Sequence, residues 1–127
     1  MIVEKKEQLK YLYAFKEGKI KRGLGIGNEL DNWVLYKRGS FNIIVGLDNV
    51  GKTNFMLWYF LALSIKHNIK WLLWSGENSA GQLTRDLIQM YSQTKLNYLS
   101  KSKIEEYNTK IGKWFTFVSN KKMYNHK

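Results

Sequence analysis

The sequence contains no cysteine and no proline, and it has only two histidines, His67 and His126. Without cysteine the chain can form no disulfide, no zinc ribbon, no iron–sulfur site and no thiol nucleophile. The two histidines are too far apart in sequence to suggest a metal-binding motif. Disulfide-stabilised scaffolds, zinc modules and cysteine-dependent enzymes are therefore excluded as classes.

Long apolar runs are also absent. The longest run covers nine residues, 55–63, which is about half of what a transmembrane helix needs. The N-terminal residues Met-Ile-Val-Glu-Lys-Lys-Glu carry acids early and lack the apolar segment of a signal peptide. We therefore expect a cytoplasmic protein without a membrane-associated segment.

The chain does have a large surplus of positive charge. Its 127 residues include 21 Lys and Arg against 10 Asp and Glu, which gives a formal net charge of +11. Residues 1–22 and residues 101–127 each hold seven basic residues, against three and two acidic ones, so both ends are basic. This surplus favours polyanionic partners through counterion release. A solvated, lysine-rich surface without such a partner is an equally favoured interpretation.

Apolar spacing predicts strands that alternate with helices over most of the chain. Short β-branched or aromatic runs indicate strands, and apolar residues at helical spacing indicate helices. The predicted strands cover residues 41–45, 69–74 and 114–118, and the predicted helices cover residues 52–67, 103–111 and a stretch that begins at Ser79. Ser79 and Gln82 form a capping box at that start. Such alternation implies right-handed crossovers and a parallel sheet, so the predicted fold class is α/β.

The N-terminal residues follow a different pattern. Within residues 4–17, Leu9, Leu12 and Tyr13 lie at helical spacing among charged residues, which predicts an amphipathic helix ending at Gly18. We therefore divide the chain into a basic amphipathic segment, residues 1–22, and an α/β domain, residues 23–127.

Between the first predicted strand and the first predicted helix of this domain lies the pattern G-x-x-x-x-G-K-[ST]. It consists of Gly46, Leu47, Asp48, Asn49, Val50, Gly51, Lys52 and Thr53. The glycines allow backbone N–H groups to approach phosphates closely. Lys52 brings a positive charge to the β- and γ-phosphates, and the Thr53 hydroxyl can ligate Mg²⁺. The motif predicts a phosphate-binding loop. Its one acid, Asp48, is expected to point outward.

A candidate general base follows the second predicted strand. The strand ends at Trp74, and Ser-Gly-Glu-Asn-Ser follows, with Glu77 in the middle. In a parallel sheet, ligands bind beyond the carboxyl ends of the strands. If this strand lies beside the first one, Glu77 faces the γ-phosphate, where it can orient and deprotonate a water molecule. The alternative is that Glu77 is an acidic residue that interacts favourably with a helix dipole.

These two motifs, in this order, resemble the RecA-like ATPase core, in particular that of DnaB-type replicative helicases. In that family the strand after the phosphate loop leads into a catalytic glutamate and the string E-x-S-x-x-Q-L, and residues 77–83 read Glu-Asn-Ser-Ala-Gly-Gln-Leu. Residues 25–39 are similar to the family's lead-in to its first strand. Residues 75–79 are equally similar to RadA-type recombination ATPases. The resemblance spans about residues 23–120.

The resemblance implies a partial RecA-like P-loop fold, the first half of an ATPase domain, with a parallel sheet flanked by helices. It implies ATP and Mg²⁺ as cofactors, Thr53 as a metal ligand, and Lys52 and Glu77 as catalytic residues. It also implies single-stranded DNA as a partner, a ring of identical subunits, and residues 1–22 as a linker or docking helix. The predicted strand 114–118 ends without the family's Walker B aspartate, and no arginine finger is identified. Whether the chain is an enzyme by itself is therefore left open.

Two alternatives to a DnaB-like helicase remain. One is a RadA-like recombination ATPase. The other is a basic nucleic-acid-binding protein with a vestigial, non-hydrolysing loop, whose Trp and Tyr side chains stack on bases. Most of these aromatic residues lie at core spacing, however, and are expected to pack inside the protein.

Overall fold

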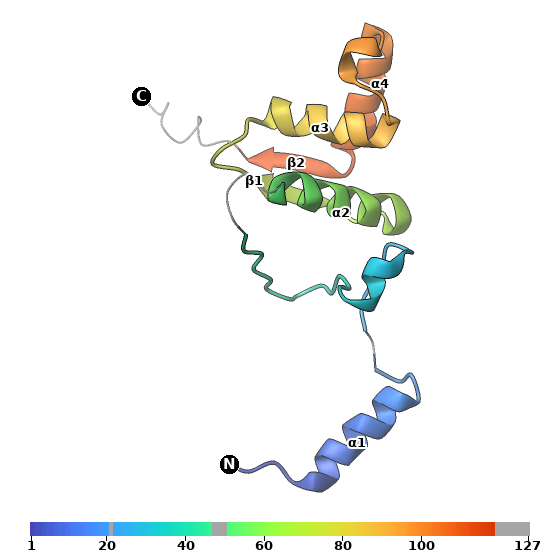
Figure 1. Cartoon of the computed structure of the whole chain (residues 1–127), viewed down its shortest axis with the longest axis vertical. Coiled ribbons are helices and arrows are strands. Elements are labelled where there is room, and N and C mark those ends of the chain that lie inside the picture. The colour runs from blue at the N-terminus through green and yellow to red at the C-terminus, as the bar shows by residue number, and fades with distance from the viewer. Residues whose placement is uncertain (21, 47–50, 119–127) are drawn as a thin grey trace. The chain divides into compact units, whose positions relative to one another are not determined.

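The computed structural model describes residues 1–20, 22–46 and 51–118. The chain forms two compact units, Met1–Phe41 and Asn42–Lys127. The described residues contain four α-helices, two short 3₁₀ helices and one sheet of two parallel strands (Figure 1). Within these residues no helix is both long enough and apolar enough to span a bilayer.

The first unit consists of helix α1 and a closed loop. α1 covers Lys5–Lys16, one residue shorter at each end than the predicted amphipathic helix, and none of its residues is buried. The loop is closed by Leu24 and Tyr36, whose backbones exchange two hydrogen bonds of 2.7 and 2.8 Å. Inside it, the Asp31 carboxylate accepts hydrogen bonds from the amides of Ile26 and Gly27, at 2.7 and 2.8 Å. The loop is therefore fixed by its own hydrogen bonds.

The second unit has the alternation that the sequence predicts. Its elements are α2 (Lys52–His67), β1 (Trp71–Trp74), α3 (Ala80–Ser92), the 3₁₀ helix η2 (Leu96–Tyr98), α4 (Lys101–Gly112) and β2 (Phe115–Val118). The two strands are parallel, with Trp71 opposite Phe115 and Trp74 opposite Val118. The α/β class and the parallel pairing are thus confirmed.

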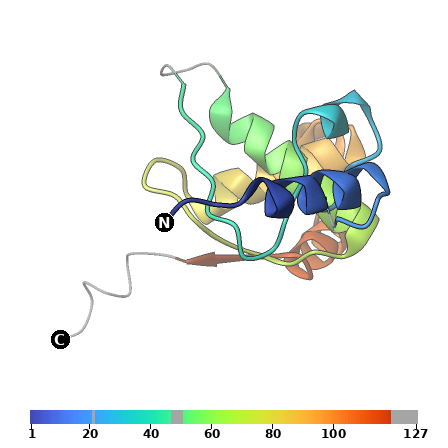
Figure 2. The same cartoon turned by 90° about the horizontal axis from the view of Figure 1, so that it is seen from below.

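The core of this unit lies on one face of the sheet. α2 and α3 lie side by side (Figures 1 and 2), and their apolar faces meet residues from α4 and β2. The buried cluster consists of Leu57, Leu61, Leu83, Leu87, Ile88, Ile111 and Phe115. Trp71 and Leu73 of β1 pack against it, whereas Leu72 and Trp74, which alternate with them, are 70% and 59% exposed. Within the described part of the chain, the sheet is covered by helices on one face only.

The predicted first strand, residues 41–45, is wrong. No strand is assigned there, and Phe41, Ile43 and Val45 are 73–89% exposed. A β-branched run indicates that a segment can be extended, but a strand also needs a partner for its backbone groups. The sheet of the described residues has β1 and β2 as its two strands, and neither pairs with this segment.

Side-chain hydrogen bonds join the end of α2 to β1 and to the residue that precedes β2. Ser64, which is 1% exposed, donates to the carbonyl of Ile69 at 2.7 Å and accepts from Trp71 Nε1 at 2.8 Å. The Trp71 ring also stacks on Phe60, with a centroid distance of 4.1 Å. The C-cap residue Asn68 accepts a hydrogen bond from Trp114 Nε1 at 2.9 Å. These contacts connect α2 with β1 and with Trp114, the residue before β2.

Candidate functional site

The predicted phosphate loop is described at both of its ends. Gly46, Gly51, Lys52 and Thr53 belong to the described residues, whereas Leu47, Asp48, Asn49 and Val50 lie outside them. The expectation that Asp48 points outward therefore concerns a residue outside the described ones.

Gly51 is the residue at which the loop turns into α2. It occupies the N-cap position with φ 87° and ψ 23°, which is left-handed backbone, and its carbonyl accepts the first helical hydrogen bond, from Phe55. A Cβ at this position would meet no atom within 4 Å, so the backbone conformation alone requires glycine here. The helix starts as predicted, with its positive end at the loop.

Lys52 folds back toward the start of the loop. Its Nζ donates a hydrogen bond of 2.6 Å to the carbonyl oxygen of Gly46. The carbonyl is a neutral acceptor, so this hydrogen bond lacks the attraction between opposite charges that a phosphate oxygen would add. A phosphate at this place would therefore compete effectively with the carbonyl for the ammonium group.

Lys52 and Thr53 line a hollow of about 300 Å³ together with the end of β1. Leu73, Trp74 and Ser75 form the β1 side of this hollow. The N-terminus of α2 and the carboxyl end of β1 thus meet at one site, as expected for a ligand crevice in a parallel α/β unit. Apolar side chains of α2 and α3 close its inner wall, and Ile44, from the segment that is not a strand, completes the lining.

Glu77 is in the turn that follows β1. Its side chain is exposed and is not part of the lining of the hollow that holds Lys52 and Thr53. The turn is fixed by Ser75, whose Oγ accepts hydrogen bonds from the amides of Glu77 and Asn78, at 3.3 and 3.1 Å. The structure therefore brings the turn to the hollow without placing the carboxylate in it.

Neither sequence motif predicts a role for Ser75. A serine at a strand end, followed by glycine, favours a turn in which the hydroxyl accepts hydrogen bonds from backbone amides. The sequence contains this signal. Ser75 also lines a second hollow, of about 460 Å³, between the β1–α3 turn and the end of β2.

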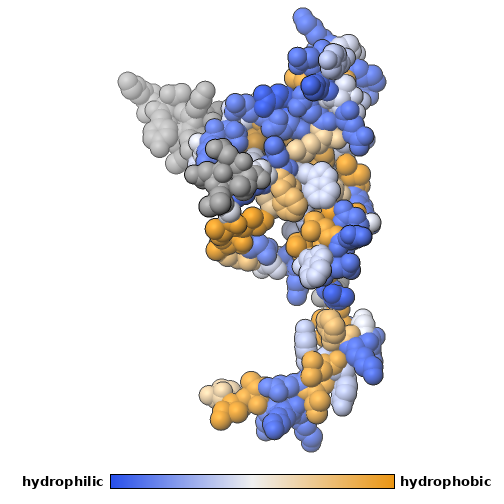
Figure 3. Space-filling model, in the orientation of Figure 1, coloured by the Kyte–Doolittle hydropathy of each residue, from blue (hydrophilic) through white to orange (hydrophobic). Residues whose placement is uncertain are grey.

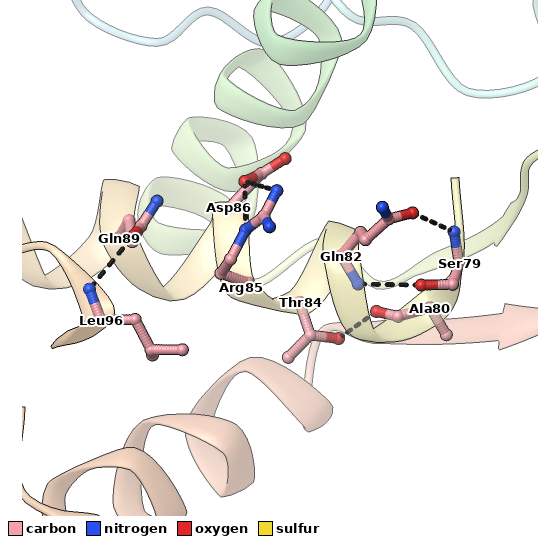
Figure 4. Close-up of polar contacts among 8 residues, drawn as sticks. All are labelled: Ser79, Ala80, Gln82, Thr84, Arg85, Asp86, Gln89 and Leu96. Carbon is pink, nitrogen blue, oxygen red and sulfur yellow. Dashed lines mark hydrogen bonds and ion pairs between the residues drawn. The ribbon is translucent and has the colours of Figure 1, made fainter. Parts of the chain in front are cut away.

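The start of α3 confirms the predicted capping box (Figure 4). Ser79 Oγ accepts from the Gln82 amide at 3.2 Å, and Gln82 Oε1 accepts from the Ser79 amide at 2.9 Å. Further along the helix, the guanidinium of Arg85 pairs with Asp86 at 3.1 Å. In the structure, Ser79 and Gln82 therefore serve to begin the helix that supports the turn.

No cluster of three or more His, Cys, Asp or Glu side chains that could hold a metal ion occurs among the residues described. Mg²⁺ in nucleotide sites is usually held by one or two protein ligands together with phosphates and water. Thr53, which lines the same hollow as Lys52, offers one hydroxyl ligand of the kind that a metal arriving with its nucleotide would need.

The chain was compared with known protein families, curated proteins and solved structures, and none of them matches.

Proposed function

We propose that the chain is the ATP-binding part of a DnaB-like helicase, built on a RecA-like P-loop core. The observation that carries this proposal is the hollow shared by Lys52, Thr53 and Ser75, at the N-terminus of α2 and the carboxyl end of β1. The motif provides the phosphate-binding residue types, and this hollow lies where the crevice of a parallel α/β sheet is expected.

In this proposal Lys52 exchanges its neutral partner for an anion. Its ammonium leaves the Gly46 carbonyl, which it contacts at 2.6 Å, and pairs with the β- and γ-phosphates of ATP. The Thr53 hydroxyl contributes one ligand to Mg²⁺, which neutralises phosphate charge when it is bound. Both residues sit in the first turn of α2, where the helix dipole also favours an anion.

Glu77 is the proposed general base for the attacking water. Because its side chain lies outside the hollow in the structure, hydrolysis requires the β1–α3 turn to move so that the carboxylate faces the γ-phosphate. The proposed partner is single-stranded DNA, and the proposed working assembly is a ring of identical chains. The same position of Glu77 supports the second candidate, a non-hydrolysing basic nucleic-acid-binding protein with a vestigial phosphate loop.

Calorimetric titration with Mg-ATP tests nucleotide binding. Lys52→Ala should remove most of the affinity, whereas Lys66→Ala should preserve it, because Lys66 is exposed in the last turn of the same helix. Equal affinities in the two variants would contradict the proposed phosphate site.

A further inference from the structure

The unit Met1–Phe41 contains a hollow of about 380 Å³ with an unusual lining. Tyr11 and Phe15 of α1 and Trp33 of the closed loop form its aromatic part, and Arg22 and Lys37 contribute two cations. The volume lies within the usual range of small-ligand pockets, about 300–1,000 Å³. In Figure 3, apolar and hydrophilic side chains alternate over the exposed surface of α1.

The aromatic side chains of this hollow are exposed, although their backbone lies in hydrogen-bonded helix and turn. Trp33 is 85% exposed, yet its amide donates to the Leu30 carbonyl at 2.9 Å, at the end of the 3₁₀ turn Glu29–Asn32. Tyr11 is 56% exposed and Phe15 is 47% exposed. Isolated exposed apolar residues need no explanation, but a group of large rings around one hollow indicates a binding surface.

The lining of the hollow carries more positive than negative charge. The Arg22 guanidinium lies 5.4 Å from the centroid of the Phe15 ring, within the range of a cation–π interaction. Asp31, the acid that lines this hollow, directs both carboxylate oxygens to the amides of Ile26 and Gly27. Residues 1–41 as a whole hold nine basic and five acidic side chains. The hollow thus combines aromatic faces with positive charge.

We propose that this hollow binds single-stranded nucleic acid, with bases stacked on Trp33 and Tyr11 and backbone phosphates paired with Arg22 and Lys37. Bases stack on exposed rings and phosphates require cations, so this ligand uses both parts of the lining. An apolar peptide would satisfy the rings alone. The inference gives the proposed helicase function a place for its nucleic acid, but it uses no residue of the phosphate loop.

Fluorescence anisotropy of the full chain with labelled oligothymidylate tests this site. Tyr11→Ala and Trp33→Ala should each weaken binding by roughly 5- to 100-fold, the usual effect of removing a stacking partner. The matched control is Tyr13→Ala, because Tyr13 is 60% exposed on the same helix but does not line the hollow. Its affinity should stay within about twofold of the wild type. Circular dichroism of each variant reports whether α1 is retained.

The nucleic-acid arms of the experiment identify the recognised form. Oligothymidylate and oligouridylate should bind similarly, and a duplex of the same length should bind more weakly, since its bases are already stacked. Equal losses in Tyr11→Ala and Tyr13→Ala, equal binding of duplex, or no binding at low salt would each overturn the inference. Because these measurements contain no nucleotide and the hollow shares no residue with the one that holds Lys52 and Thr53, failure here is distinguishable from failure of the ATP site.

Discussion

The Nζ of Lys52 lies 2.6 Å from the carbonyl oxygen of Gly46, so the lysine spans the two ends of the predicted phosphate loop. This hydrogen bond joins the first turn of α2 to the residue at which the motif begins. It holds the Lys52 ammonium on a neutral acceptor, which in the proposed function is replaced by a phosphate. The proposed function depends on that replacement.

Gly51→Ala tests the backbone conformation at the start of α2. Because Gly51 has φ 87°, an alanine there should lower the free energy of unfolding by about 1–2 kcal/mol, although its Cβ has open space. Urea unfolding measures the change. Gly112→Ala is the control, since Gly112 lies within α4 with open space and no left-handed backbone; it should be neutral or slightly stabilising.

Ser64→Ala tests the connection between α2 and β1. The buried hydroxyl donates to the Ile69 carbonyl and accepts from the Trp71 indole, so its removal should cost about 1–3 kcal/mol of stability. The expected cost is at the low end, because Trp71 Nε1 also donates to the Phe60 carbonyl at 3.1 Å. Ser102→Ala, at an exposed position in α4, should change stability by less than about 0.5 kcal/mol. Equal effects of the two substitutions would contradict the network.

Val45→Thr tests whether the segment before the phosphate loop is a buried strand. Val45 is 87% exposed, so replacing one of its methyl groups with a hydroxyl should change the free energy of unfolding by less than about 0.5 kcal/mol. For comparison, Leu87→Ala removes a fully buried side chain of α3 and should cost about 2–5 kcal/mol. If Val45→Thr lowered the free energy of unfolding by more than about 2 kcal/mol, the segment would be a buried strand, as the sequence predicts.

Glu77→Gln separates hydrolysis from nucleotide binding. The amide has the shape of the carboxylate but cannot accept a proton, so ATP turnover should be lost while calorimetric ATP affinity is preserved. Steady-state hydrolysis and binding are measured on the same preparations. Glu106→Gln, an exposed position of α4, is the control. Normal turnover by Glu77→Gln would show that another group is the base; no turnover by the wild type would favour the non-hydrolysing candidate.

The sequence predicted the local elements of the second unit well. α2 has the predicted bounds, and the Ser79–Gln82 capping box is formed, because both depend on residues close together in the chain. The strand over residues 41–45 was predicted from its apolar composition, but strand formation depends on a pairing partner that no local pattern contains. Long-range pairing is also why the order of the strands could not be derived.

Site prediction had the same limit. The motif predicts Lys52 and Thr53 as phosphate-binding residues, and the structure adds that Ser75 lines the same hollow and orients the turn of Glu77. The exposed position of Glu77 depends on that turn. The hollow beside Trp33 could not be predicted either, because its lining comes from α1 and from a loop closed by Leu24 and Tyr36.

Affinity labelling with an acyl-phosphate derivative of ATP tests directly whether Lys52 lies beside the bound phosphates. The amine of a lysine close to the bound phosphates attacks the acyl carbonyl, forms an amide and releases ATP, and peptide mass spectrometry then identifies the modified residue. The chain has 18 lysines. We expect Lys52 to be labelled ahead of the other lysines and excess Mg-ATP to suppress its labelling. Labelling spread over exposed lysines, with Lys52 not preferred and no protection by ATP, would contradict this expectation.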